Sequence, residues 1–172
     1  VTWYYVVSLI GKTLVLLIAP INTIVISYLT KRKELLTRSQ FGKAVLAGGG
    51  VSLVFFLACQ VGTPLFVWLF YRNLYDSVKG LVTVVNLAQI LGLFSAFLFI
   101  LVLTFTDEKW QLWIQLAHFA VLLVTSVLAA RAYGMIGFAW ASLGANSLRV
   151  AAVIILGLVK AGKDKGGSNA DR

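Results

Sequence analysis

The sequence predicts an all-α protein, a polytopic transmembrane helix bundle. Three observations support this prediction: 60% of the 172 residues are hydrophobic, only 12% are charged, and most charges fall between long apolar runs. A soluble domain carries about twice that share of charged residues. Apolar runs of roughly 20 residues match the thickness of a bilayer core. The chain is therefore expected to be a multi-pass protein of the cell membrane.

Five apolar runs are long enough to cross a membrane as helices. Transmembrane strands would alternate polar and apolar positions over about 10 residues, and these runs do not. Helices satisfy their own backbone hydrogen bonds in lipid, so a helical bundle over residues 1–159 is expected. The predicted spans cover residues 3–29, 44–70, 81–105, 110–130 and 135–159. Residues 160–172 combine glycine, serine and charge, and we expect a disordered tail there.

The short connectors carry most of the positive charge, and this charge predicts the orientation. Five spans put the 30–43 loop, the third connector and the tail on one side, which holds ten Lys and Arg against three opposite. Lys and Arg collect in cytoplasmic loops, so the 30–43 loop and the C-terminus are expected in the cytoplasm. The net charge of +9 is explained in this way, and nucleic acid is not an expected partner.

Two cations lie inside predicted spans. Arg149 precedes the end of its span by ten residues, which places it roughly 15 Å deep. Lys12 is also near mid-depth in the first span. A cation at the centre of a span costs at least about 2.5 kcal/mol on insertion scales, so both are candidate binding residues. Both also admit a structural role, with Arg149 bonded to carbonyl groups and Lys12 snorkelling to the interface.

Several uncharged polar residues accompany these cations. Asn146 lies three residues before Arg149 and shares its helix face. Asn86 and Gln89 form a milder polar face on the third span, where hydrogen bonding between helices is the alternative role. Pro20 cannot donate a backbone hydrogen bond, so it predicts a bend in the first span.

Carboxylates are absent from the predicted spans. The six acidic residues all fall in connectors or in the tail, at Glu34, Asp76, Asp107, Glu108, Asp164 and Asp171. Spans that hold cations without carboxylates attract anions such as phosphate, pyrophosphate or acidic sugars. Asp107 and Glu108 are the only acidic pair, which we interpret as a solvated connector, and metal-ligand spacing is absent, so we predict no enzyme activity, no metal site and no cofactor. Cys59 is the single cysteine, which excludes a disulfide within the chain.

Three stretches resemble the carboxy-terminal part of the polysaccharide and oligosaccharide-lipid flippases, whose superfamily also contains multidrug and toxin extrusion transporters. The stretch WYYVVSLIGKTLVLLIAPINTIVISYLTKR is similar to a Tyr-led helix followed by a proline and a basic loop. The stretch TPLFVWLFYRNLYDSVKGLVTVVNLAQIL resembles a proline-containing helix end, an aromatic hairpin and the next span. AYGMIGFAWASLGANSLRV resembles the glycine-bearing turn that opens the last helix.

The resemblance implies a function in transport. The chain would supply about five helices at the C-terminal end of a twelve- to fourteen-helix transporter whose N-terminal half is missing here. Such a flippase moves an undecaprenyl-pyrophosphate-linked oligosaccharide or polysaccharide repeat unit across the cytoplasmic membrane by alternating access. Lys12 and Arg149 would bind the pyrophosphate or acidic sugars, Asn86, Gln89 and Asn146 would bind sugar hydroxyls, and Pro20 would act as a hinge. A cation-coupled multidrug antiporter, a membrane-embedded transferase subunit and a non-transporting scaffold are the alternatives.

Overall fold

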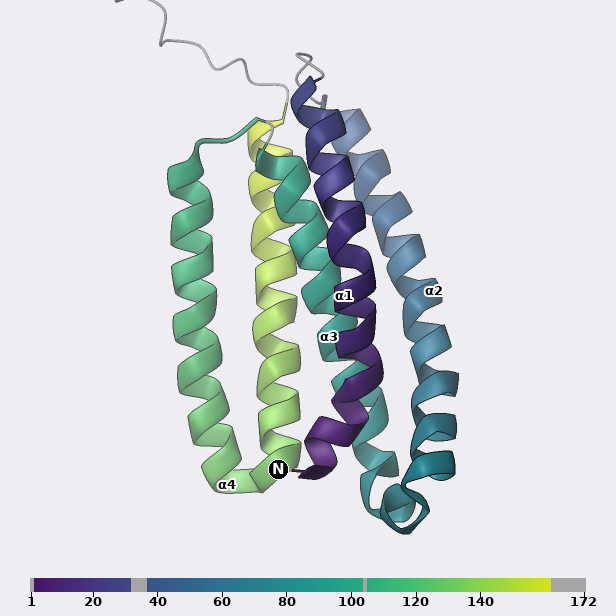
Figure 1. The fold of residues 1–172 in the computed structure, drawn as a ribbon. Coiled ribbons are helices and arrows are strands. Elements are labelled where there is room, and N and C mark those ends of the chain that lie inside the picture. Colours follow the sequence, from purple (N-terminus) through teal and green to yellow (C-terminus); the bar gives the residue numbers. More distant parts are fainter. Residues whose placement is uncertain (1, 32–36, 104, 162–172) are drawn as a thin grey trace, which may run out of the picture.

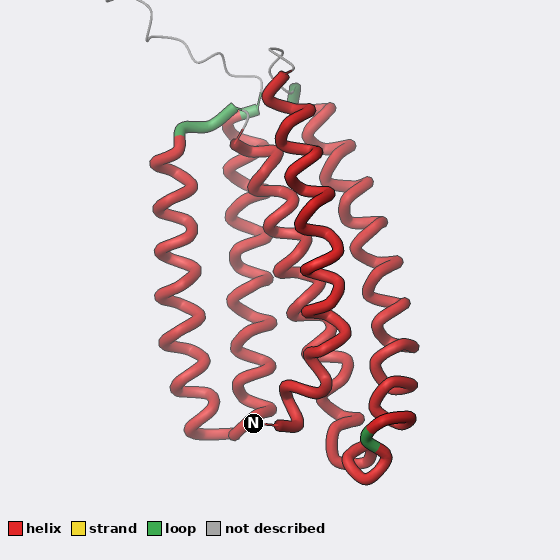
Figure 2. Tube along the Cα trace, viewed as in Figure 1, coloured by secondary structure: helices red, strands yellow, loops and turns green. Residues whose placement is uncertain are grey.

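The computed structural model describes residues 2–31, 37–103 and 105–161, and every regular element in these ranges is helical. The predicted all-α class is confirmed. The predicted disordered tail, apart from its first two residues, and residues 32–36 of the 30–43 loop lie outside the described residues. Figures 1 and 2 show the helices, which are α1 (Thr2–Lys31), α2 (Arg38–Phe70), the 3-10 helix η1 (Arg72–Leu74), α3 (Tyr75–Leu103) and α4 (Glu108–Lys160).

Helix α2 begins at Arg38, six residues before the predicted span. The start is fixed by a capping box in which the Thr37 hydroxyl accepts from the Gln40 backbone N–H and the Gln40 side chain accepts from the Thr37 N–H. Residues 38–43 of the predicted connector are therefore helical, and the bounds of the membrane span stay a prediction. Hydropathy finds the part of a helix that lies in hydrocarbon, whereas the cap decides where the helix starts.

Helix α4 combines two runs that the sequence predicts as separate spans, 110–130 and 135–159. Of the predicted connector 131–134, only Gly134 leaves helical geometry, with φ 63° and ψ −142°, and the bounds of the two membrane spans stay a prediction. We call residues 108–133 the first arm and 135–160 the second arm. Figure 1 shows the two arms folded back beside each other, joined at the end of the bundle where the N-terminus lies. Gly137 supports the tight bend, since a Cβ there would collide with the Ala129 carbonyl.

Within the described residues, three helices are long and apolar enough to cross a membrane. They are Arg38–Phe70, Tyr75–Leu103 and Lys109–Lys160. The apolar helical stretch found in α1, Tyr4–Leu16, is shorter. The prediction of about five crossings therefore stays a prediction. Helix α1 is a single element from Thr2 to Lys31 with Pro20 inside it, and the hinge role of Pro20 also stays a prediction.

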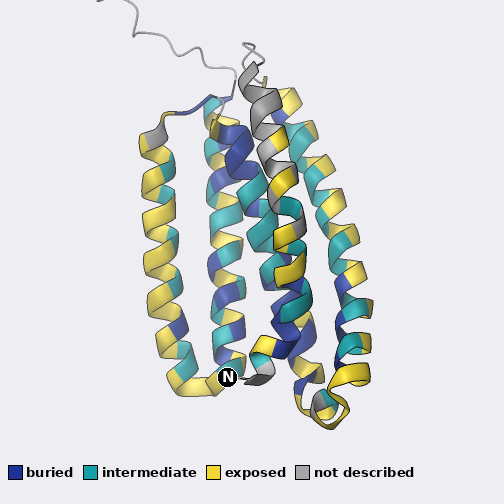
Figure 3. Ribbon diagram, viewed as in Figure 1, coloured by how far each residue is buried: buried dark blue, intermediate teal, exposed yellow. Residues whose placement is uncertain are grey.

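Helix α3 is the centre of the bundle. Over its most apolar window 56% of the residues are buried, against 6% for α2 and for α4, so the other helices pack around it (Figure 3). Two apolar clusters lie along α3, and the polar side chains of Asn86, Gln89 and Ser95 lie between them. The first cluster unites all four α-helices through Val6, Val7, Val67, Val78, Leu81, Val82, Val85 and Ala139. The second contains Phe41, Leu98, Phe99, Leu101, Val102, Phe105, Val153 and Ala161.

The bend of α4 generates a prediction about Gly134. Its backbone conformation is one that only glycine adopts readily, so Gly134→Ala should lower the free energy of unfolding by about 1–3 kcal/mol. Gly144→Ala is the matched control, because Gly144 is helical and a Cβ there meets no atom within 4 Å. This control should be neutral or slightly stabilising. Unfolding in mild detergent by added denaturing detergent measures both, and equal stability of the two variants would contradict the account.

Candidate functional site

Arg149 extends from the second arm of α4 onto α3. The centre of its guanidinium lies 4.8 Å from the centroid of the Phe99 ring, a cation–π contact. The Nε atom of Arg149 is buried and finds no hydrogen-bond partner among the described residues. The ion pair found in this part of the chain joins Lys79 to Asp76 on an exposed surface, so no described carboxylate neutralises Arg149. A desolvated cation–π contact contributes about 2 kcal/mol, against a cost of at least about 2.5 kcal/mol for a cation at the centre of a span, so part of that cost is left uncompensated.

Asn146 joins three parts of the bundle one turn from Arg149. Its Nδ2 donates to the Ala88 carbonyl on α3 at 2.9 Å, and its Oδ1 lies 3.2 Å from Nε2 of His118 on the first arm. Because the amide oxygen can only accept, Nε2 of His118 is the donor. The predicted shared face is found here, since Asn146 and Arg149 both contact α3.

A small hollow lies between the two arms of α4 and contains both ionisable side chains. It measures about 140 Å³, room for several water molecules or one small polar group. His118 and Arg149 supply its polar atoms. Three of the other lining residues are alanines, whose short side chains leave the hollow unfilled. The full lining is Ile114, Ala117, His118, Val121, Ala145, Leu148, Arg149 and Ala152. Chemically, the Arg149 guanidinium beside an open space can bind an anion, whereas the N–H of a neutral His118 is already donated to Asn146.

Asn86 is bound into the seam between α3 and α2. Its side chain is fully buried, its Nδ2 donates to the Cys59 carbonyl at 3.1 Å and to Gln60 Oε1 at 3.3 Å, and its Oδ1 accepts from the Thr63 hydroxyl at 3.3 Å. Gln60 in turn donates to the Thr83 hydroxyl at 2.9 Å. With its amide donors and its oxygen engaged, Asn86 fits the interhelical role better than a sugar-binding one.

Gln89 and Lys12 lie on the α1 side of the bundle. Gln89 packs so closely on Gly11 that a Cβ there would collide with its side-chain amide, and its buried Oε1 has no partner among the described residues. Lys12 is exposed, with Nζ 4.6 Å from the ring centroid of Tyr5 on the same helix. The two cations therefore have separate partners, Tyr5 of α1 for Lys12 and Phe99 of α3 for Arg149.

The sequence analysis did not identify several residues that contact Asn86 and Arg149. Gln60 and Thr63 carried a signal, since both are polar residues inside an apolar run, next to Pro64. Pro64 offers no N–H to the carbonyl of Gln60, so backbone bonding in α2 is incomplete beside the Asn86 seam. Phe99 gave no signal, because nothing distinguishes it from the other phenylalanines of its run.

The hydrogen bonds of Asn146 generate a prediction. Asn146→Ala should lower the free energy of unfolding by about 1–2 kcal/mol, because the Ala88 carbonyl and His118 lose a partner inside the bundle. Ser147→Ala is the control, since its exposed hydroxyl bonds only the Leu143 carbonyl of its own helix. Unfolding with denaturing detergent measures the difference. If both alanine variants unfold at the same detergent fraction, the bridging role of Asn146 is wrong.

Comparisons with known proteins do not identify a family for this chain. The scan of family models and the searches of curated proteins and of solved structures each find no match. The resemblance to flippases therefore stays a prediction. What the chain does has to be argued from the chemistry of Arg149 and its surroundings.

Proposed function

We propose that the chain is part of a membrane transporter that moves an anionic, lipid-linked oligosaccharide across the cytoplasmic membrane. The observation that carries the proposal is Arg149, a mid-helix guanidinium with a buried, unbonded Nε and no acidic partner among the described residues. A protein that keeps such a cation in an apolar helix has a use for its charge. An anion that visits the site supplies the missing partner only while it is bound.

The hollow leaves room beside Arg149 for an oxygen of a pyrophosphate group. His118 lines the same hollow and donates its Nε2–H to Asn146, so the guanidinium supplies the donors for the anion. Asn146 holds His118 and α3 in place, so in this proposal it positions the site. Gln89 has a free buried acceptor and remains a candidate for sugar hydroxyls. Asn86 is assigned to the α2–α3 seam instead.

Lys12 enters the proposal on a different surface. Its side chain is exposed on α1, although the residue lies within the apolar helical stretch Tyr4–Leu16. In a transporter of twelve to fourteen helices, further helices would face this surface and enclose Lys12 in a central cavity. About five crossings of this chain, a cytoplasmic C-terminus and a hinge at Pro20 belong to the same proposal. The anionic lipid-linked glycan would then contact Lys12 and Arg149 in different conformations of the transporter.

The proposal predicts that Arg149→Gln impairs transport without impairing folding. Loss of a charged hydrogen bond to the substrate should reduce flipping of a lipid-linked oligosaccharide at least about tenfold in vesicles that contain the complete transporter. Stability should be unchanged or higher, because an uncompensated charge leaves the apolar bundle. Arg149→Lys should retain part of the activity.

Arg131→Gln is the matched control, because Arg131 is exposed beside the bend of α4. It should flip the substrate at the rate of the unmodified protein. Normal flipping by a well-folded Arg149→Gln variant would remove Arg149 from the mechanism. A large loss of stability in that variant would instead assign Arg149 a structural role.

A further inference from the structure

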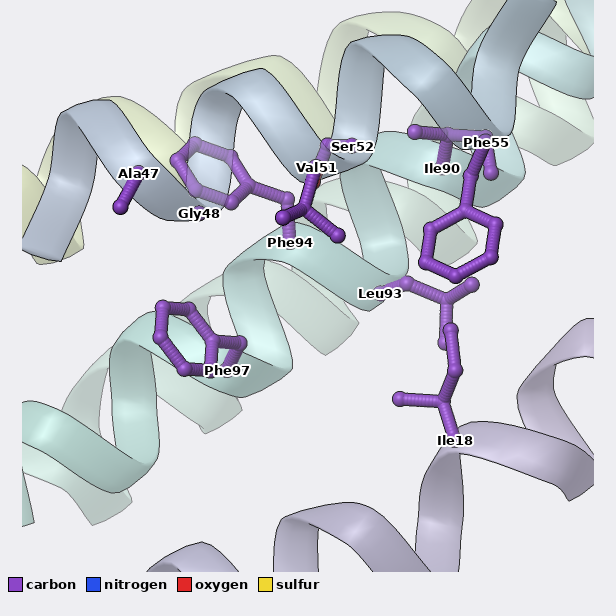
Figure 4. A pocket seen from close by; sticks show the side chains of 10 residues that line it. All are labelled: Ile18, Ala47, Gly48, Val51, Ser52, Phe55, Ile90, Leu93, Phe94 and Phe97. Carbon is purple, nitrogen blue, oxygen red and sulfur yellow. The ribbon is translucent and has the colours of Figure 1, made fainter.

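The hollow that contains Arg149 differs in chemistry from the larger hollow of the bundle. The larger hollow lies beside α2 and α3, and Figure 4 shows the side chains that line it, among which Ser52 is the one with a polar group. The smaller hollow is lined by an imidazole and a guanidinium, from His118 on the first arm of α4 and Arg149 on the second arm. The smaller hollow is therefore the one whose polar side chains can select a ligand.

The two ring nitrogens of His118 have different roles. Nε2 donates its hydrogen to Oδ1 of Asn146 at 3.2 Å, and Asn146 in turn donates to the Ala88 carbonyl of α3. A neutral imidazole has one N–H group, so Nδ1 carries a lone pair and is an acceptor. Nδ1 forms no hydrogen bond within the described residues. It is therefore the ring nitrogen that is left for a ligand.

The charges around His118 favour its neutral form before a ligand binds. Residues 80–103, 110–130 and 135–159 contain no carboxylate, and Arg149 is the one charged side chain in these three ranges. Lys12 of α1 lies over the Tyr5 ring of its own helix. A second positive charge beside Arg149 would find no opposite charge in these helices, so the neutral ring with its free acceptor is favoured.

A donor and an acceptor thus belong to the same hollow. The buried Nε–H of Arg149 has no acceptor among the described residues, and Nδ1 of His118 has no donor. The ionised oxygens of a pyrophosphate can only accept, so they satisfy Arg149 and leave Nδ1 unpaired. A ligand that satisfies both side chains carries an O–H group a few atoms from its anionic oxygen. In a glycosyl pyrophosphate, the hydroxyl on the sugar carbon next to the anomeric carbon meets this requirement.

We propose that His118 selects the sugar attached to the pyrophosphate, by accepting a hydrogen bond from this hydroxyl at Nδ1 while Arg149 donates to a pyrophosphate oxygen. This role of His118 rests on the proposed function, because it requires an anionic lipid-linked glycan at Arg149. The Nε2–H bond to Asn146 holds the ring in place and stays intact when the ligand binds. Protonation of Nδ1 would turn the acceptor into a donor, so the selection depends on the neutral ring.

Binding of two matched ligands to the full chain in lipid nanodiscs tests this role. One ligand is a short-chain prenyl pyrophosphate ester of glucose, and the other is its 2-deoxy-2-fluoro analogue, which cannot donate from that carbon. The NMR signal of the Arg149 Nε–H group follows both titrations, so the affinities refer to this site. At neutral pH the glucose ester should bind about fivefold more tightly, the ratio expected from one hydrogen bond between uncharged groups.

The two ligands also separate this role from the proposed function. Equal binding of both esters at Arg149 would overturn the role of His118 and leave the proposed anion site standing. If neither ester shifted the Arg149 signal, the anion site and the role of His118 would both be wrong.

Lowering the pH should remove the preference. Once the ring signals of His118 show a protonated imidazole, Nδ1 donates and no longer accepts, while a doubly esterified pyrophosphate keeps its charge. The affinity ratio of the two esters should then fall to about one. A ratio that protonation of His118 leaves unchanged would contradict the acceptor role.

Two substitutions separate the two ends of the imidazole. His118→Gln keeps an amide donor near the Nε2 position for Asn146 and removes the acceptor at the Nδ1 position, so stability should be kept and the preference lost. His118→Asn places its oxygen near the Nδ1 position but is too short to reach Asn146, so it should retain part of the preference at lower stability. The opposite pattern would assign the preference to the Asn146 bond and overturn the proposal. Gln115→Ala, which changes an exposed residue of the same arm outside the hollow, is the control and should bind both esters like the unmodified chain.

Discussion

The arrangement of the bundle depends on how buried amide groups are satisfied along α3. Asn86 and Asn146 do this in the same way, each donating from Nδ2 to a backbone carbonyl on a neighbouring helix, Cys59 on α2 and Ala88 on α3. An unbonded amide in apolar surroundings costs several kcal/mol, so each bond fixes both the contact and the rotation of the helices. Apolar clusters on both sides of these amide contacts complete the packing.

Arg149 differs from these asparagines because its buried Nε–H has no hydrogen-bond acceptor among the described residues. Phe99 attracts the guanidinium through its ring face, but an aromatic ring cannot accept the Nε–H as a carboxylate would. The alanines between the arms of α4 leave an open space at this point instead of closing it with larger side chains. A cation with an unbonded Nε and open space beside it are the features of a site that receives an anion from outside the chain. This is the physical basis of the proposed transport function.

The sequence predicted the helical class and the shared face of Asn146 and Arg149, because hydropathy and the period of the helix are local properties. It did not predict the partners of Asn86, since these depend on how α2 is rotated against α3, a result of distant contacts such as Gly48 against Phe97. Nor could it show that Lys12 and Arg149 have separate partners. The resemblance of AYGMIGFAWASLGANSLRV implied a glycine-bearing turn before the last helix, but the sequence did not show that helical geometry continues to residue 133 and that Gly134 alone completes the bend.

Whether an anion accepts a hydrogen bond from Arg149 can be observed directly. In lipid nanodiscs, the NMR signal of the Arg149 Nε–H group reports its hydrogen bonding, and the Arg149→Lys variant identifies that signal by its loss. Adding a short-chain prenyl pyrophosphate should shift the signal downfield in a saturable manner, because the pyrophosphate supplies the acceptor that the described residues lack. An Arg149 signal that stays in place while the ligand is bound elsewhere on the protein would contradict the account.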